Sequence, residues 1–404
     1  LNFNQFALIC LPSLLLPKSD LPFPFPSLKP NTYLSSLTSL RGIAAILVVL
    51  FHVEGIWIHF GPKEGGFFLH QCYLMVDFFF LLSGFIMVHV YGPTFSNGPA
   101  WTSWKRFMQH RFARIYPLHF FSFAVMVAFF LIEFSDKKPE GLDAFIYNLY
   151  AIPTNLLLIH SLGIHSLFSW NVPSWSISTE WWMYVIFPFL FPWWQSLNKL
   201  KFGLLFLGLA AGYLFINYIL YPHSVASSPL PMNRGYSLDV TYNYGFFRCF
   251  LGFVLGMQLY RIYSGGWMKN WLKSDFLFFG VVGLAFGLMH FGLPDYFLVL
   301  CFAALLLMAV WNAGLAGTIL QWKPLQFLGD ISYSIYMIHG PLLFIGLAIM
   351  GHLFPGIQYD KTPIQSLFYV LAYLGLLLTV SYLTYRTIEL PFRQWLGGRK
   401  PKNG

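Results

Sequence analysis

The apolar stretch SLRGIAAILVVLFHVEG carries an arginine and a histidine whose types and spacing suit acid–base chemistry next to a bound anion. Arg41 and His52 are eleven residues apart. In an α-helix, at about 100° per residue, this step leaves the side chains only ~20° apart, with ~16 Å between them along the axis. Histidine titrates near neutral pH and can act as a general base, and arginine binds anions. Structural roles stay open for both: Arg41 as a headgroup anchor and His52 as a hydrogen-bonded core histidine.

Three more ionisable residues lie in apolar stretches of the sequence: two carboxylates and a second histidine. Asp77 opens DFFFLLSGFIM, Glu180 lies in WSISTEWWMY, and His339 lies in SYSIYMIHGP. Charged groups at membrane depth are costly and usually face a helix-bundle interior or a watery cavity. Either carboxylate is therefore a candidate to orient an imidazole, as in a catalytic triad, and the alternative is a pair with a buried basic residue. Ser83, beside Gly84, offers a small surface for close helix contact.

A pair of arginines in WKRFMQHRFARIYPLH suits phosphate binding. Arg111 and Arg114 are three residues apart, so a helix places both guanidinium groups on one face, one turn before Pro117. The alternative is that they are ordinary basic residues at a membrane surface, in contact with lipid. Arg248 in RCFLGFVLG, or His339, is a candidate to stabilise a tetrahedral oxyanion.

Metal and redox chemistry find little support in the sequence. No HExxH or HxxxH spacing is present, so we expect no metal site and no bound cofactor. The cysteines show no CxxC and no recurrent spacing, which favours buried small apolar residues over a disulfide framework; they are Cys10, Cys72, Cys249 and Cys301.

The composition indicates elements that cross a membrane many times. Apolar residues make up 57% of the chain, aromatic residues 20% and charged residues only 10%, whereas a soluble domain carries about 25% charged residues. The net charge of +9 sits in short connections between apolar stretches, which is typical of the positive-inside rule. We therefore expect a lipid bilayer around the chain and no nucleic-acid partner.

Eleven apolar stretches follow residue 40, and the fourth is the weakest because polar residues and a proline interrupt it. If it does not span and the N-terminus is cytoplasmic, eighteen basic residues lie inside and five outside; a spanning fourth stretch reverses this bias. We predict an all-α, polytopic membrane helix bundle with about ten transmembrane helices, a re-entrant or interfacial segment, and both termini cytoplasmic. The stretches are 41–60, 67–91, 112–134, 144–162, 175–192, 202–221, 243–261, 276–292, 296–314, 332–353 and 364–385.

The same pattern divides the chain into three parts. Residues 1–36 form an N-terminal extension that we expect to be poorly structured, because its apolar run is too short and too broken by prolines to span a bilayer. Residues 37–395 form the integral-membrane domain. Residues 396–404 form a basic cytoplasmic tail.

Seven blocks in order give the chain a resemblance to the acyltransferase 3 family of membrane O-acyltransferases, from about residue 38 to 395. Any single block is weak, whereas seven in order are specific. They are Arg41 with His52 after ten residues; DFFFLLSGF from Asp77; Arg111-x-x-Arg114 before IYP; WSISTEWWMY with Glu180; RCFLGFVLG with Arg248; SYSIYMIHGP with His339; and ELPFR with Glu389.

The resemblance implies a multi-pass enzyme of the cell membrane, most readily a bacterial cytoplasmic membrane. It implies transfer of an acyl group, acetyl being the expected one, from cytoplasmic acyl-CoA to a hydroxyl of an extracytoplasmic glycan or lipid-linked sugar. His52 would be the general base or the acyl carrier, and acyl-CoA would be a co-substrate bound by Arg111, Arg114 and Arg41. Ser83, Arg248 and Glu389 would support this site.

Two differences from the family and two rival functions remain open. His110 stands where many members have a further arginine, and the N-terminal extension has no match in the family. Many relatives carry an SGNH-type esterase domain after the last helix; we expect none here, so the chain would act alone or pass its acyl group to a separate extracytoplasmic partner enzyme. A transporter or flippase of a glycan or lipid intermediate would also carry intramembrane charges, although no inverted repeat is evident. A non-catalytic membrane scaffold would need every buried ionisable group to be structural.

Overall fold

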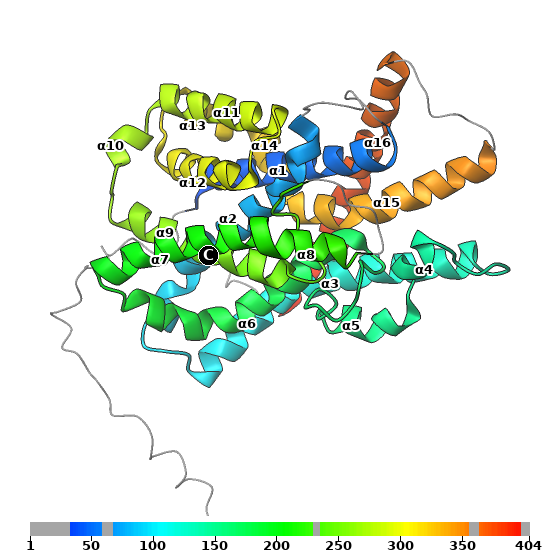
Figure 1. Ribbon diagram of the computed structural model, residues 1–404, viewed down its shortest axis with the longest axis horizontal. Coiled ribbons are helices and arrows are strands. Elements are labelled where there is room, and N and C mark those ends of the chain that lie inside the picture. Colours follow the sequence, from blue (N-terminus) through cyan, green and yellow to red (C-terminus); the bar gives the residue numbers. More distant parts are fainter. Residues whose placement is uncertain (1–32, 59–67, 229–234, 355–362, 397–404) are drawn as a thin grey trace, which may run out of the picture.

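The computed structural model describes residues 33–58, 68–228, 235–354 and 363–396, which fold into helices joined by short turns (Figure 1). No strand occurs within these ranges. The all-α class predicted from the sequence is thus confirmed. Most of the predicted N-terminal extension and nearly all of the basic tail lie outside the described residues.

Among the residues that the structure describes, six helical runs are long and apolar enough to cross a membrane, and two shorter apolar helices accompany them. The count of ten spans and the side of each terminus remain predictions. The long runs are α1 (Ser35–Ile56), η1 with α2 (Phe68–Leu74, Met75–Phe95), α3 (Trp101–Glu133), α7 with η4 and α8 (Lys199–Phe215, Ile216–Leu220, Tyr221–Ala226), α15 (Ser332–Leu353), and α16 with η5 and α17 (Pro363–Thr384, Tyr385–Glu389, Leu390–Leu396). The shorter apolar helices are α11 (Asp275–His290) and α12 (Asp295–Trp311).

The weak fourth stretch, 144–162, forms no continuous long helix. Pro153 and the polar residues around it leave only brief helical turns, α4 (Leu142–Ile146), η2 (Leu149–Ala151) and α5 (Ile152–Leu156). Backbone broken in this way is tolerated at membrane depth where protein surrounds it. The buried side chain of Asn155 donates to the carbonyl oxygen of Ala151 (2.8 Å) and to the hydroxyl of Ser169 (2.9 Å), which ties the segment together.

The remaining helices complete the bundle and connect its long members. They are η3 (Val172–Ser174), α6 (Trp175–Gln195), α9 (Gly245–Ser264), α10 (Lys269–Leu272), α13 (Leu315–Leu320) and α14 (Lys323–Asp330). Prolines lie inside α2, α3, α6 and α15 without ending these helices. Neighbouring helices in a membrane bundle help to satisfy the backbone groups that proline frees.

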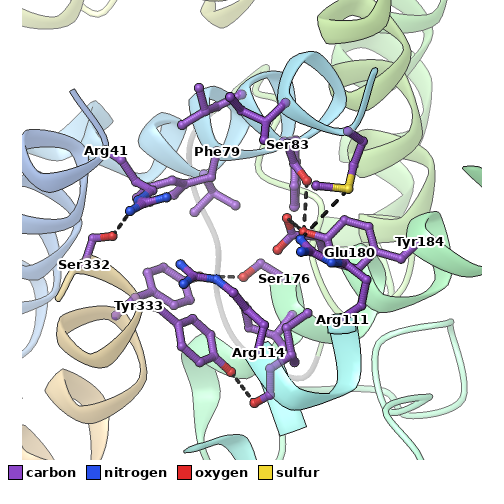
Figure 2. A pocket seen from close by; sticks show the side chains of 18 residues that line it. Arg41, Phe79, Ser83, Arg111, Arg114, Ser176, Glu180, Tyr184, Ser332 and Tyr333 are labelled. Atoms are coloured by element: carbon purple, nitrogen blue, oxygen red, sulfur yellow. Dashed lines mark hydrogen bonds between the residues drawn. The ribbon is translucent and has the colours of Figure 1, made fainter. Parts of the chain in front are cut away.

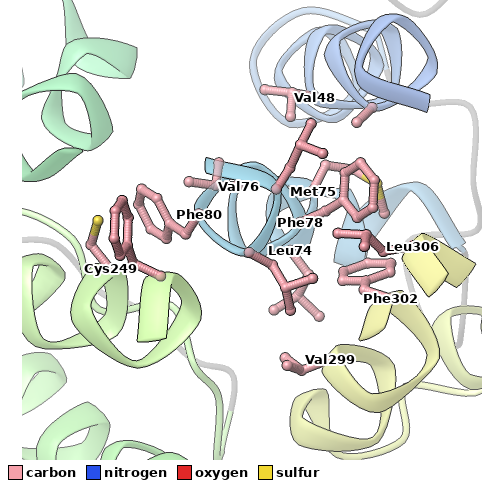
Figure 3. Packing of buried hydrophobic residues seen from close by; sticks show 14 of the residues in the cluster. Val48, Leu74, Met75, Val76, Phe78, Phe80, Cys249, Val299, Phe302 and Leu306 are labelled. Carbon is pink, nitrogen blue, oxygen red and sulfur yellow. The ribbon is translucent and has the colours of Figure 1, made fainter. Parts of the chain in front are cut away.

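Helix α2 lies at the centre of the apolar core, with α1, α9 and α12 around it (Figure 3). Its closest neighbour is α9, because glycines let the two backbones touch. A Cβ atom at Gly84 would overlap the carbonyl oxygen of Phe253, and one at Gly256 would overlap that of Leu81. The expected close helix contact beside Ser83 is therefore present, and it fixes the register of α2 against α9.

Helices α1 and α15 lie side by side and run in the same direction. Arg41 of α1 contacts Ser332 of α15, and His52 of α1 contacts His339 of α15. The predicted placement of Arg41 and His52 on one helical face is confirmed, since both turn toward α15.

Candidate functional site

A cavity of about 150 Å³ lies among α1, α2, α3, α6 and α15 (Figure 2). Its charged lining residues are three arginines, Arg41, Arg111 and Arg114, and one carboxylate, Glu180. The lining thus carries an excess of two positive charges. A cavity of this kind, hereafter the basic cavity, suits an anionic ligand because opposite charges attract strongly where water is scarce.

Arg41 is fixed at the wall of the basic cavity by α14 and α15. Its Nε donates to Ser332 Oγ (2.8 Å), and its Nη2 donates to the carbonyl oxygen of Gly329 (2.6 Å). Ser332 Oγ in turn donates to the same carbonyl (2.8 Å). The guanidinium is therefore held in one orientation by uncharged acceptors, so these hydrogen bonds do not neutralise its positive charge, which can act on a ligand.

Arg111 and Arg114 reach the cavity from one face of α3, as their spacing predicts. Arg111 Nη2 donates to the hydroxyl of Tyr91 (3.0 Å), and its guanidinium lies 5.1 Å from the centre of that ring. Arg114 Nη1 donates to Glu389 Oε1 (3.1 Å). Glu389 is buried in the π-helical turn η5, and Ser334 donates to its other oxygen (3.0 Å). Glu389, in the last helical run, thus fixes the position of the Arg114 guanidinium.

Glu180 lines the basic cavity and does not contact His52. Its Oε1 accepts a hydrogen bond from the hydroxyl of Tyr184 (2.5 Å), which lies 3.1 Å from Ser83 Oγ. Ser83 itself lines the cavity. From the sequence we expected it only to support the site.

His52 and His339 form a pair of imidazoles just beyond the basic cavity. Their ring centres lie 4.8 Å apart, and neither residue lines the cavity itself. The ring of Tyr336 does line it and lies 5.7 Å from that of His339. The side chain of Tyr336 therefore lies between the basic cavity, which the arginines line, and the histidine pair.

The backbone selects the tautomer of His52. Nδ1 lies 2.9 Å from the carbonyl oxygen of Val48, which can only accept, so Nδ1 carries the proton of the neutral ring. The lone pair is then on Nε2, which is the arrangement a general base requires. Both nitrogens of His339 are buried and make no hydrogen bond within the described residues.

Asp77 and Arg248 pair with each other, which is the alternative role that the sequence left open for Asp77. The action of Arg248 on an oxyanion stays a prediction. Arg248 Nη2 donates to Asp77 Oδ2 (2.6 Å) and Arg248 Nε to Asp77 Oδ1 (3.1 Å), with both side chains buried. Arg248 Nη1 also reaches Asp239 Oδ1 (3.2 Å). The ion pair of Asp77 and Arg248 joins α2 to α9. Asp77 accepts its hydrogen bonds from Arg248 and Glu180 accepts one from Tyr184, so neither of these two carboxylates orients His52 in the structure.

Three further residues build the site, although as uncharged side chains they do not stand out in the sequence. Tyr184 lies in WSISTEWWMY, while Ser332 and Tyr336 lie in SYSIYMIHGP, each one or two helical turns from the ionisable residue in its block. Spacing of three, four or seven residues from Glu180 and His339 is the signal that would have placed them on the same face. Within the ranges that the structure covers, no group of three or more His, Cys, Asp or Glu could hold a metal ion.

The fold and the site define an all-helical protein, suited to a membrane, whose helices enclose a basic cavity next to a histidine pair. The chain belongs to the acyltransferase 3 family: the family model, described as an acyltransferase domain, matches residues 34–386. This assignment favours an acyltransferase over the transporter and scaffold alternatives. No solved structure matches the chain.

Curated relatives extend over most of the chain. Acyltransferase MdmB of Streptomyces mycarofaciens is 29% identical over 392 residues, covering 91% of this chain and 94% of that protein. Peptidoglycan O-acetyltransferase OatA of Listeria monocytogenes is 25% identical over 398 residues, covering 92% of this chain and 58% of that protein. O-acetyltransferase OatA of Staphylococcus aureus is 24% identical over 402 residues, covering 90% of this chain and 57% of that protein. The chain therefore spans little more than half the length of the OatA proteins.

Proposed function

We propose that this chain is a membrane O-acyltransferase that moves an acyl group, acetyl being the expected one, from cytoplasmic acyl-CoA to a hydroxyl of an extracytoplasmic glycan or lipid-linked sugar. One observation carries the proposal: three arginines line one cavity, and Tyr336 in its wall lies against His339, whose ring lies against that of His52. An anion site and a candidate base thus lie next to each other inside the bundle.

The donor would bind through its phosphates. Coenzyme A carries several phosphate oxygens, which accept charge-assisted hydrogen bonds from guanidinium groups. Arg114 uses only Nη1 for Glu389, so its Nε and Nη2 are available to such a ligand within the described residues. With Arg114 paired to Glu389, Arg41 and Arg111 still face one lining carboxylate, Glu180, so one positive charge of the lining is left for an anionic ligand to compensate.

The transfer itself would use His52 as a base. Nε2 accepts the proton of the acceptor hydroxyl while that oxygen attacks the thioester carbonyl carbon. The tetrahedral intermediate expels the coenzyme A thiolate, which takes the proton from the imidazolium and leaves as a thiol. An acyl-histidine intermediate is the alternative form of the step, in which Nε2 attacks first and the hydroxyl then releases the acyl group.

The acceptor side rests on the relatives and on topology. The Listeria relative is named a peptidoglycan O-acetyltransferase, which favours an envelope glycan as the acceptor of this chain too. With a cytoplasmic N-terminus, His52 lies beyond Arg41 in the outward direction of α1, so an acceptor would arrive from the opposite side to the donor. A cell membrane, most readily that of a bacterium, would house such an enzyme, either alone or with a separate extracytoplasmic partner enzyme.

The test is acyl transfer by purified protein in lipid nanodiscs. Radiolabelled acetyl-CoA is supplied with envelope glycan, and both released coenzyme A and labelled glycan are measured. We expect the wild type to transfer the label and His52→Ala to lose about 10²- to 10⁴-fold in rate, the usual contribution of a general base. His290→Ala is the matched control, because His290 is exposed at the end of α11.

Two results would contradict the proposal. Equal rates for His52→Ala and His290→Ala would remove His52 from the chemistry. Wild-type protein that binds no acyl-CoA, yet still acylates glycan with another thioester or ester donor, would overturn the donor assignment while leaving the transferase activity intact.

A further inference from the structure

A second cavity, of about 280 Å³, lies away from the basic cavity among α1, α2, α11, α12 and α13, and every described residue that lines it is apolar. Its α1 residues are Leu40, Ile43, Ala44 and Leu47, which share one helical face. That face is roughly a third of a turn away from Arg41 and His52. The apolar cavity therefore takes no part in the site described above.

The apolar cavity is large enough to hold part of a hydrocarbon ligand. Protein interiors contain few voids larger than a water molecule, and an engineered apolar cavity of about 150 Å³ stays dry and takes up benzene. Polar ligands find no hydrogen-bonding partner on walls made of side chains such as Phe278 and Phe302. The chemistry of the walls therefore selects a hydrocarbon.

The apolar cavity is continuous with the outer surface of the apolar helices. Phe279 and Phe286 of α11 and Ile319 of α13 line it and are also exposed. In a bilayer that surface faces lipid chains, so a chain can enter sideways between α1 and α11 without crossing water.

Basic and aromatic residues mark one end of the apolar cavity. Lys273 precedes α11, and its carbonyl oxygen accepts from the side chain of Asn312 (3.0 Å), just before α13. Lys323 follows α13, and both lysine side chains are exposed. Each has an exposed tryptophan beside it, Trp271 (73% exposed) and Trp322 (62% exposed). Tryptophan and lysine together are typical of the level of lipid headgroups, and lysine there attracts anionic ones.

We propose that this cavity is a binding site for one acyl chain of an anionic phospholipid, whose headgroup lies between Lys273 and Lys323. By the positive-inside distribution of charge these lysines are cytoplasmic, so the lipid belongs to the inner leaflet. The bound chain fills the space between α1 and α11 and so stabilises the packing of the helix that carries Arg41 and His52.

The experiment measures phospholipid that remains bound to the full-length protein after exhaustive detergent washing, by native mass spectrometry. The probes are phosphatidylglycerol, phosphatidylcholine and a polyisoprenyl phosphate. We expect the wild type to retain phosphatidylglycerol at about one molecule per chain. Ala285→Trp, which fills the apolar cavity from α11, should lose it. Leu300→Trp is the matched control, because Leu300 is exposed on α12 and does not line the cavity.

Charge and location are tested separately. Lys273→Glu and Lys323→Glu should each lower the preference for phosphatidylglycerol over phosphatidylcholine about fivefold. A phosphatidylglycerol with a photoreactive acyl chain should label α1, α11 or α12 of the wild type, a result that does not depend on the folding of any variant. Equal retention by Ala285→Trp and Leu300→Trp, labelling of other helices, or stronger retention of the polyisoprenyl phosphate would overturn the proposal.

Discussion

The ring of His52 on α1 lies 4.8 Å from the ring of His339 on α15, tilted by 57°. The two helices run in the same direction, and the same pair of helices also brings Arg41 to Ser332. One helix interface therefore holds both the candidate base and one arginine of the basic cavity. Movement of α15 against α1 would release both side chains, because Ser332 holds Arg41 and His339 lies against His52, so this interface fixes their orientation for the proposed reaction.

Replacing His339 separates positioning from donor binding. His339→Gln removes the ring that lies against His52 but leaves the lining of the basic cavity unchanged. We expect kcat to fall and the KM for acyl-CoA to stay near its wild-type value, because uniform binding of the donor is untouched. Steady-state kinetics at several acyl-CoA concentrations give both constants. A raised KM with an unchanged kcat would show that His339 acts on donor binding instead.

Replacing Arg114 or Arg111 should act on the donor. Each methionine variant removes charge-assisted bonds to a phosphate, worth about 1.5–3 kcal/mol, so KM for acyl-CoA should rise about 10- to 150-fold. Arg106→Met is the matched control, because Arg106 is exposed on α3 and does not line the cavity. Equal KM values for all three variants would remove the basic cavity from donor recognition.

Glu389 should act through Arg114. Glu389→Gln keeps the shape of the side chain but removes the charge that fixes the guanidinium, so we expect a smaller rise in donor KM than for Arg114→Met. In a double-mutant cycle the two changes should be strongly non-additive, because both remove the same interaction. Glu140→Gln, at an exposed position before α4, is the control. Additive effects on KM would mean that Glu389 supports the fold without positioning Arg114.

The buried pair of Asp77 and Arg248 should matter for stability. Asp77→Asn leaves the guanidinium of Arg248 buried without its full counter-charge, and such a loss destabilises by about 3–5 kcal/mol. Thermal unfolding in a fixed detergent measures the change, with Asp136→Asn in an exposed turn as the control. Combining Asp77→Leu with Arg248→Met should recover most of the lost stability, because the two fully buried charges are removed together and only the partly exposed Asp239 loses a contact. If Asp77→Asn unfolds at the wild-type temperature, the pair does not hold α2 to α9.

Local spacing in the sequence predicted those parts of the site that depend on a single helix. The eleven-residue step placed Arg41 and His52 on one face of α1, and the three-residue step placed Arg111 and Arg114 on one face of α3. Helix geometry alone decides these relationships. The small residues Ser83 and Gly84 likewise predicted a close contact with another helix, but the sequence did not identify α9 as that helix.

Contacts between segments far apart in the sequence could not be predicted from local spacing. Asp77 and Arg248 are 171 residues apart, and Arg114 and Glu389 are 275 apart, so their pairing depends on how whole helices pack. The sequence left two roles open for Asp77, orienting an imidazole or pairing with a buried basic residue, because either offsets the cost of a charge in the membrane. The structure shows the second, with a guanidinium on α9. The tautomer of His52 depends on a carbonyl of its own helix, which the sequence does not distinguish from any other.

The membrane topology is testable at both ends of α3. The ten-span arrangement places the start of this helix inside the cell and its end outside, so Arg111 and Arg114 face the compartment that holds acyl-CoA. In intact cells a membrane-impermeant maleimide should label Lys138→Cys, whereas Lys105→Cys should react only after permeabilisation; both positions are exposed. A reporter fused after Lys402, beyond the described residues, should read cytoplasmic. The opposite labelling pattern would reverse α3 and put the basic cavity out of reach of cytoplasmic coenzyme A, because the arginines would then lie nearer the outer surface.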